Sequence, residues 1–291
     1  MKRRNFLWYS TLLLTGCAAA STTVDRSSST QALPPKLRFA VTDVKGLEDL
    51  QQDYGSLRAA LAEALQTEVE FFPVENYTTA TIALKQGEVE LALAGPSEYV
   101  VITSRTNAIP VVAVTRRNYH SIIAVRAGSP VKAVADLKGK TIAMSDIGST
   151  SGHLGPTKLL LDAGLAPQTE VEIRMLGDEG SIKAIKQGKV DAWGGSAVDY
   201  KDFLQNTANT FPILIEGMPL PSDVFIASSS VASASINLIR ERMLTNQKQL
   251  IEAIAKHQSK YEGSQLIIAK DEDYDPIREV YRAVGQGDFV Q

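Results

Sequence analysis

The sequence contains a single cysteine, Cys17, in 291 residues. One cysteine, placed at an N-terminal processing signal, excludes a disulfide, a cysteine nucleophile and a thiolate metal site within one chain. Histidine, aspartate, glutamate and tyrosine do not recur at metal-ligand spacing, so neither a metal nor another cofactor is expected. A Gly-x-Ser-x-Gly nucleophile motif is also missing. These absences argue against an enzyme and leave a binding protein as the predicted class.

Basic clusters and long apolar runs are scarce as well. The formal net charge is −3, and lysine and arginine gather only at the N-terminus. A mildly acidic chain without a basic patch is a poor binder of nucleic acid. After the first 17 residues, no run approaches the ~20 apolar residues of a transmembrane helix. Any anion that binds must therefore be held by a local site, because the overall field does not attract it.

The N-terminus has the pattern of a secretion signal. A basic stretch, Lys2 to Arg4, precedes a short apolar core, Phe6 to Leu14. The following Leu-Thr-Gly-Cys sequence resembles a bacterial lipobox, in which Cys17 is lipidated and becomes the first mature residue. We expect a lipoprotein signal peptide at 1–17, a Ser/Thr-rich flexible tether at 18–35, and a periplasmic protein anchored to the membrane by lipid alone. An ordinary cleaved signal with an incidental cysteine is the alternative.

Strands and helices alternate from residue 36 onward. This alternation predicts an α/β protein with mainly parallel sheets. The expected strands are 37–41, 69–74, 89–94, 109–114, 122–126, 141–144 and 224–227, and the expected helices are 57–65, 79–85, 98–103 and 238–257.

The chain also repeats itself. Residues 83–92 match 184–193, and both read as a helix end, a glycine cap and a strand. We interpret this as two similar lobes, with Trp193 in the core of the second, that face a common crevice. The predicted bounds are 36–118 with 222–291 for lobe 1 and 119–221 for lobe 2, with crossings near Arg117–Ser121 and Gly217–Asp223.

Residues 149–156 form the most informative segment. They lie between an apolar run, 141–144, and a helical stretch that begins near Leu159, so they predict a turn from a strand into a helix. The first turn of a helix has free N–H groups and the positive end of the helix dipole. Ser149, Thr150 and Ser151, with His153 beside them, would make this turn a site for tetrahedral oxyanions. A plain serine N-cap with a surface histidine is the alternative.

These features together resemble the periplasmic phosphonate/phosphite-binding proteins of ABC transporters. The similarity runs from about Lys36 to Val280 and includes segments 119–125 and 136–140. It implies a two-lobed periplasmic binding protein fold of type II with the ligand cleft between the lobes. It also implies a monomer without enzymatic activity that captures phosphite or a small phosphonate, such as methylphosphonate, by hinge closure. The partners would be the permease and ATPase of an ABC importer.

The resemblance also implies a set of ligand-binding residues. In the family the Ser-Thr-Ser turn grips the phosphonyl oxygens, and an acidic residue of the second lobe corresponds to Glu179, although Asp178 beside it leaves open which one faces the cleft. A carboxylate there accepts a hydrogen bond from a protonated phosphonyl group. The predicted set is Ser149, Thr150, Ser151, His153, Tyr77, Ser97, Tyr99, Ser121, Glu179 and Asp199.

Several of these residues have simpler interpretations. Tyr77 reads equally as a surface residue at a helix start, Tyr99 as a core residue, and His153 as a solvent-facing cap. The predicted set has no long basic side chain, which favours recognition by neutral donors and helix dipoles. Another oxyanion, such as phosphate or a sulfonate, is the alternative ligand, and a sensor lipoprotein of the same fold is the alternative role.

Overall fold

The computed structural model describes residues 33–44, 46–205 and 210–290, all within one compact unit. The predicted signal peptide (1–17), Cys17 and all but the last three residues of the tether (18–35) lie outside the described residues. Their assignments therefore stay predictions. None of the described helices is long and apolar enough to cross a membrane.

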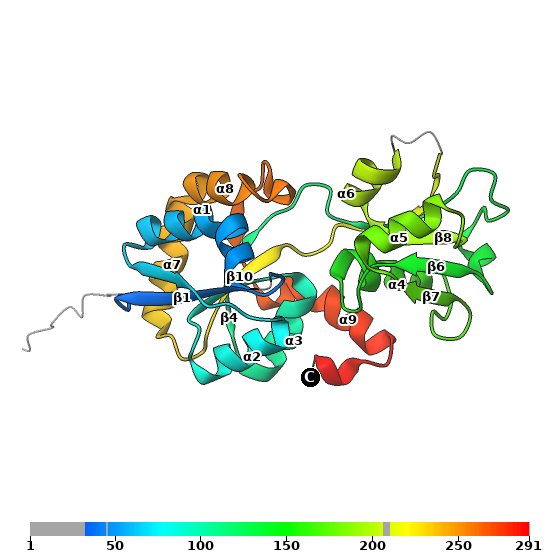
Figure 1. The fold of residues 1–291 in the computed structure, drawn as a ribbon. Coiled ribbons are helices and arrows are strands. Elements are labelled where there is room, and N and C mark those ends of the chain that lie inside the picture. The colour runs from blue at the N-terminus through cyan, green and yellow to red at the C-terminus, as the bar shows by residue number, and fades with distance from the viewer. Residues whose placement is uncertain (1–32, 45, 206–209, 291) are drawn as a thin grey trace, which may run out of the picture. The chain divides into compact units, whose positions relative to one another are not determined.

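The strands form two sheets (Figure 1). The six-stranded sheet has the order β11-β4-β10-β3-β1-β2, and the five-stranded sheet has the order β7-β6-β8-β5-β9. The first sheet contains β1 (Lys36–Val41), β2 (Glu68–Phe71), β3 (Leu91–Ala94), β4 (Ile109–Val114), β10 (Asp223–Ala227) and β11 (Leu266–Ile268). The second contains β5 (Ser121–Val125), β6 (Thr141–Met144), β7 (Glu172–Met175), β8 (Ala192–Ser196) and β9 (Ile213–Glu216).

Helices connect most of these strands. The α-helices are α1 (Leu47–Leu65), α2 (Tyr77–Gln86), α3 (Pro96–Thr106), α4 (Gly155–Asp162), α5 (Gly177–Lys186), α6 (Ala197–Asp199), α7 (Ser233–Thr245), α8 (Gln247–Ala255) and α9 (Asp275–Ala283). Short 3₁₀ turns are η1 (Val134–Leu137), η4 (Ser259–Tyr261), η5 (Asp271–Tyr274) and η6 (Gly287–Phe289), and π-helical turns are η2 (Thr150–Leu154) and η3 (Tyr200–Gln205).

The expectation of mainly parallel sheets is wrong, because both sheets are mixed. Strand β1 runs parallel to β2 and β3, and β6 runs parallel to β7 and β8. Strand β10, however, is antiparallel to β3 and β4, and β5 is antiparallel to β8 and β9. Strand β4 carries the chain out of the first sheet and β10 brings it back, so these neighbours must run in opposite directions.

The predicted elements are confirmed best where apolar runs are bounded by turn residues. Strands β4 and β6 have the predicted bounds. The predicted strand 69–74 ends earlier, at Phe71, close to Pro73, which has no N–H for a sheet ladder. The predicted helix 238–257 is two helices that meet at Asn246, a weak helix former whose ψ of 20° departs from helical geometry.

The helix–glycine–strand repeat is confirmed. Helices α2 and α5 are followed by Gly87 and Gly188, each with a φ of +69°, and then by β3 and β8. A left-handed residue at this position lets the chain leave the helix, and glycine adopts it without a steric penalty. Each repeat therefore delivers a buried strand to the centre of its own sheet.

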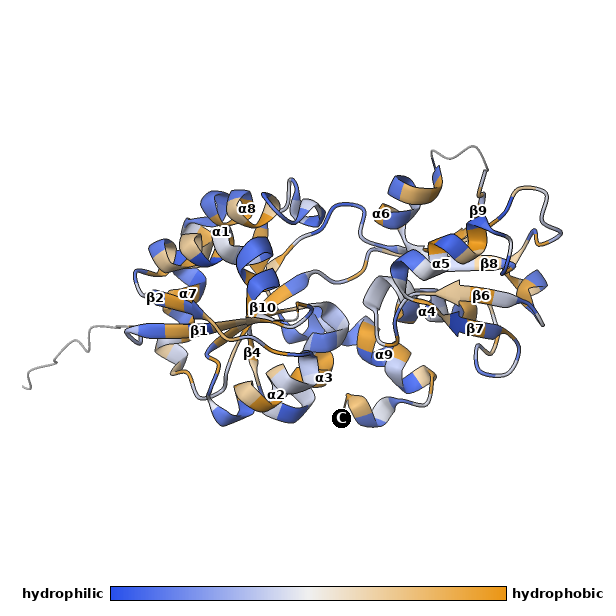
Figure 2. Ribbon diagram, in the orientation of Figure 1, coloured by the Kyte–Doolittle hydropathy of each residue, from blue (hydrophilic) through white to orange (hydrophobic). Residues whose placement is uncertain are grey.

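Apolar side chains pack on both faces of each sheet. Along β1, Phe39 belongs to one core cluster and Ala40 to another, as the two-residue period of a strand requires. Trp193 of β8 lies in the core of the second sheet at 2% exposure, as predicted, and its indole N–H donates to the Ser181 hydroxyl at 3.0 Å. In Figure 2, apolar and hydrophilic residues alternate along the helices that cover the sheets, which is the pattern of helices with one buried face.

Candidate functional site

A cavity of about 1510 Å³ is lined by residues from both sheets. Its walls come from the ends of strands and the starts of the following helices, the positions at which ligands of open α/β sheets bind. One wall contains the loop from Ala94 to Glu98, between β3 and α3. The opposite wall contains the loop 145–151, after β6, and the segment 196–203, after β8.

The hydroxyl-rich turn forms part of the second wall, and Ser149, Thr150 and Ser151 all line the cavity. The Ser149 hydroxyl accepts the N–H of Gly152 at 3.2 Å and so caps the turn η2. Thr150 reaches the other wall, where its Oγ1 accepts the N–H of Ser97 at 3.1 Å. This bond joins the turn to the N-terminus of α3, so two sets of hydrogen-bonding groups meet in one place.

Two glycines let this turn pack tightly on its neighbours. A Cβ on Gly152 would lie 2.4 Å from the Cβ of Ser145, and one on Gly155 would lie 1.8 Å from the hydroxyl oxygen of Ser121. The Ser121 hydroxyl donates to the carbonyl oxygen of Ser151 at 2.9 Å. Ser121 is buried and does not line the cavity, so it holds the turn from behind.

His153 also lies behind the turn. It is buried, and its Nδ1 accepts the N–H of Gly148 at 3.0 Å. Burial lowers the pKa of His153, which favours the neutral ring that this hydrogen bond requires. The next residue, Leu154, lies in the same apolar cluster as Val280 and Tyr281 of α9. Residues adjacent to the hydroxyls thus anchor the turn to the C-terminal helix.

The first wall presents the start of α3. Ser97 is 4% exposed, and Glu98 accepts the N–H of Gly95 at 3.0 Å and the hydroxyl proton of Thr42. Burial, with the negative charge of Asp43, raises the pKa of Glu98 to about 7. Glu98 therefore changes its charge in the neutral pH range.

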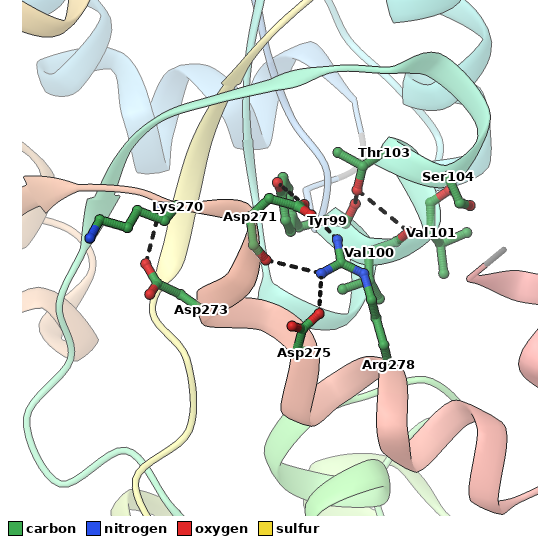
Figure 3. A network of polar contacts seen from close by, with 10 residues as sticks. All are labelled: Tyr99, Val100, Val101, Thr103, Ser104, Lys270, Asp271, Asp273, Asp275 and Arg278. Carbon is green, nitrogen blue, oxygen red and sulfur yellow. Dashed lines mark hydrogen bonds and ion pairs between the residues drawn. The ribbon is translucent and has the colours of Figure 1, made fainter.

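Tyr77 and Tyr99 have different positions. Tyr77 lines the cavity at the start of α2, where the Asn76 side chain accepts backbone N–H groups at 2.9 and 3.1 Å. Tyr99 points away from the cavity into the network of Figure 3, where its hydroxyl donates to Asp271 at 2.6 Å. Arg278 joins this network through its 2.5 Å contact with Asp271. The structure does not bring Tyr99, which is fully buried, to the site.

Two carboxylates complete the second wall. Asp178 lines the cavity and Glu179 does not, so Asp178 is the member of the pair that faces it. Asp178 accepts the hydroxyl proton of Ser145, and Asp199 accepts that of Ser196 at 2.6 Å. Burial raises the pKa of Asp199, so its negative charge is less favourable there than in water.

Long basic side chains, which the predicted set lacks, also line the cavity. Arg116, Arg117, Lys201 and Lys260 all line the cavity. Arg116 and Tyr119 lie in the crossing between β4 and β5, Tyr119 within the predicted crossing near Arg117–Ser121 and Arg116 directly before it. Their place in the predicted crossing is a sequence signal that could have pointed to these two residues. The direction of the Arg116 side chain, however, also depends on its contact with Asp223, which is distant in sequence. In the described part of the chain, no group of three or more His, Cys, Asp or Glu side chains could hold a metal ion.

A family model for the periplasmic substrate-binding proteins of phosphonate ABC transporters matches residues 39–274. A curated relative, the phosphate-import protein PhnD of Mycolicibacterium smegmatis (strain ATCC 700084 / mc(2)155), is 28% identical over 196 residues. That match covers 62% of this chain and 60% of the relative, so it spans less than two thirds of the relative's length.

Solved structures share the fold. PhnD1 from Prochlorococcus marinus (MIT 9301), in complex with methylphosphonate, matches with a TM-score of 0.67 and 17% identity over 87% of this chain and 100% of that one. The aliphatic sulphonate-binding protein SsuA from Escherichia coli matches with a TM-score of 0.60 and 19% identity over 89% of both chains. The predicted two-lobed periplasmic binding protein fold is thereby confirmed.

Proposed function

Since the chain belongs to the family of periplasmic phosphonate-binding proteins of ABC transporters, we propose that it captures phosphite or a small phosphonate, such as methylphosphonate. The ligand would bind in the cavity between the two lobes and pass to a membrane permease and its ATPase. The observation that carries this proposal is the meeting of the turn 149–151 with the N-terminus of α3. Hydroxyl and N–H groups from both lobes meet there on the cavity wall, and such groups at a helix start are the usual ligands of a tetrahedral oxyanion.

The lobes are proposed to close around this ligand. The lobe bounds stay as predicted, 36–118 with 222–291 and 119–221. The sheets are connected by segments 115–120 and 217–222, between β4 and β5 and between β9 and β10. Leu220 N–H donates to the Tyr119 carbonyl oxygen at 2.8 Å, so the two crossings run together. Two adjacent crossings can serve as a hinge, and an oxyanion bound to both lobes would favour the closed state.

Asp178 and Asp199 would set the protonation state of the ligand. A carboxylate repels a fully ionised anion but accepts a hydrogen bond from a P–OH group. A sulfonate carries no such proton at neutral pH, so these side chains favour a phosphorus oxyanion. The sulphonate-binding SsuA shares the fold, however, and a sulfonate is the ligand to test against.

The proposed location is the periplasm, with Cys17 as a lipid anchor and 18–35 as the tether. The family is one of solute-binding proteins and not a class of enzymes. Whether the protein serves in transport or as a sensor would then depend on which membrane protein it works with.

Isothermal titration of residues 31–291, which form one compact unit, tests this proposal. The ligands are phosphite, methylphosphonate, 2-aminoethylphosphonate, phosphate, methanesulfonate and sulfate. We expect micromolar or tighter binding of phosphite or methylphosphonate, about −8 kcal/mol or more favourable, with weaker binding of sulfate and the sulfonate. If no phosphorus oxyanion binds, the proposed function is wrong, and preference for the sulfonate would assign the alternative ligand.

The Thr150→Val variant should bind the preferred ligand more weakly by about 1–3 kcal/mol. Valine keeps the shape of threonine but removes the hydroxyl that faces the cavity. Titration of both proteins with the preferred ligand measures the loss. Ser104→Ala is the matched control, because the Ser104 hydroxyl donates to the carbonyl oxygens of Val101 and Phe289 and Ser104 is not among the residues that line the cavity. Equal affinity of wild type and Thr150→Val would remove this turn from the site.

A further inference from the structure

The crossing between β4 and β5 places a buried cation with an unpaired Nε in the cavity wall. The Arg116 side chain is only 14% exposed and lines the cavity wall. Its nearest counter-ion is Asp223, at a long nitrogen–oxygen distance of 3.6 Å. Asp223 is itself engaged by the Tyr261 hydroxyl at 2.6 Å. Within the described part of the chain, the buried Nε of Arg116 has no hydrogen-bond acceptor.

Arg116 is held in this position by Tyr119. The guanidinium carbon lies 3.6 Å from the centre of the tyrosine ring, close enough for a cation–π contact. Tyr119 is 6% exposed and lines the cavity. The side chains of Ser151 and Thr150 act on the Tyr119 phenol and lower its pKa, although burial has the larger, opposite effect. The Tyr119 ring therefore lies between Arg116 and the hydroxyl-rich turn, residues 149–151.

This arrangement allows the Arg116 guanidinium and the Tyr119 hydroxyl to interact with a bound anion. Tyr119 lines the cavity, and its phenol O–H can donate to a ligand oxygen there. Burial raises the pKa of Tyr119, and the positive charge of Arg116 offsets only part of this effect, so the phenol keeps its proton and can donate it to a ligand oxygen. Burial lowers the pKa of Arg116, but the negative charges of Asp223 and its neighbours raise it by more, so the guanidinium stays charged while its Nε lacks an acceptor among the described residues.

We propose that Arg116 and Tyr119 form a ligand-recognising pair, in which the Tyr119 O–H binds an oxygen of the anion and Arg116 supplies the neutralising charge. This inference rests on the proposed function and goes beyond it, because it adds a cationic element to a site otherwise made of hydroxyls, N–H groups and carboxylates. The pair recognises the charge of the ligand, whereas Asp178 and Asp199 recognise its proton. Loss of the Arg116 charge should therefore lower the affinity for phosphonates and the affinity for sulfonates by similar factors.

The test compares titrations of wild type, Arg116→Gln, Arg116→Lys and Tyr119→Phe with the preferred phosphorus oxyanion from the panel and with methanesulfonate. Arg116→Gln should lower affinity for the phosphorus oxyanion by about tenfold or more, as expected for loss of a charge-assisted contact. Arg116→Lys should recover part of that loss, since it restores the charge. Tyr119→Phe, which keeps the ring, should also bind more weakly, and the double variant should lose less than the product of the two single effects.

Arg126→Gln is the matched control, because Arg126 is exposed, lies just after β5 and does not line the cavity. It should bind as the wild type does. If the wild type binds a phosphorus oxyanion and both Arg116→Gln and Tyr119→Phe match it within twofold, the pair has no role in recognition and the inference is wrong. If the wild type binds none of the phosphorus oxyanions, the proposed function fails first, and this inference falls with it.

Discussion

Gly155→Ala should destabilise the protein by about 3 kcal/mol and weaken ligand binding. The new Cβ would lie 1.8 Å from the hydroxyl oxygen of Ser121, 2.7 Å from its Cβ and 3.1 Å from the carbonyl oxygen of Thr150. Rotating the Ser121 hydroxyl away would break its bond to Ser151 and leave the contact with the Ser121 Cβ in place. The turn must therefore shift away from β5. We expect the loss in the free energy of unfolding to lie at the upper end of the range of about 1–3 kcal/mol that is usual for overpacking. Urea unfolding measures the stability and titration measures the binding.

Two further variants isolate this effect. Gly55→Ala is the matched control, because Gly55 lies within α1 and a Cβ there meets nothing within 4 Å. It should leave stability unchanged or raise it by about 0.5–1 kcal/mol, since alanine favours a helix interior over glycine. In a Ser121→Gly background, Gly155→Ala should be much better tolerated because the opposing side chain is gone. Equal stability of Gly155→Ala and wild type would contradict the tight packing of the turn on β5.

Glu98→Gln should flatten the dependence of stability on pH between about 4.5 and 7. Burial and then the charge of Asp43 raise the Glu98 pKa to about 7, from an ordinary glutamate value of 4.5. In that window the folded protein keeps a proton that the unfolded chain has lost, so stability falls as pH rises. The loss is complete above pH 7 and amounts to at most about 3 kcal/mol, because one pKa unit corresponds to about 1.4 kcal/mol.

The measurement is urea unfolding of wild type and Glu98→Gln at pH 5, 6, 7 and 8. Other groups titrate in both proteins, so the difference between the two curves isolates Glu98. Glutamine can still accept the Gly95 N–H through its amide oxygen, so its advantage over the wild type should grow as pH rises. Glu241→Gln, an exposed residue on α7, provides the control and should keep the wild-type slope. Parallel curves for wild type and Glu98→Gln would show that Glu98 does not titrate in this range.

The candidate site illustrates how far sequence patterns reach. Ser149, Thr150 and Ser151 lie on the cavity wall as the turn predicted, because a strand end and a helix start fix the direction of a short turn locally. The choice between Asp178 and Glu179 was open in the sequence, since adjacent residues at a helix start can each face either way. Packing of α5 against β6 decides it, and the Ser145 hydroxyl reaches Asp178.

Residues whose partners are distant in sequence were the ones that local patterns could not place. Tyr99 bonds to Asp271, 172 residues away, and this contact turns it from the cavity into the first lobe's core. Arg116 is held by its neighbour Tyr119 and by Asp223, which returns on β10. The distant partners Asp271 and Asp223 help set these directions, and local sequence patterns do not reveal such partners.

The sequence by itself determined the alternation of strands and helices, the helix–glycine–strand repeat and the hydroxyl-rich turn. Each depends on residues within about ten positions of one another, so periodicity and turn chemistry are sufficient to predict them. Only the tertiary structure decided the mixed strand directions, the position of Arg116 beside Asp223 and the raised pKa of Glu98. These depend on the return of the chain through β10 and on burial between distant segments, which bring together charges and donors that are far apart in sequence.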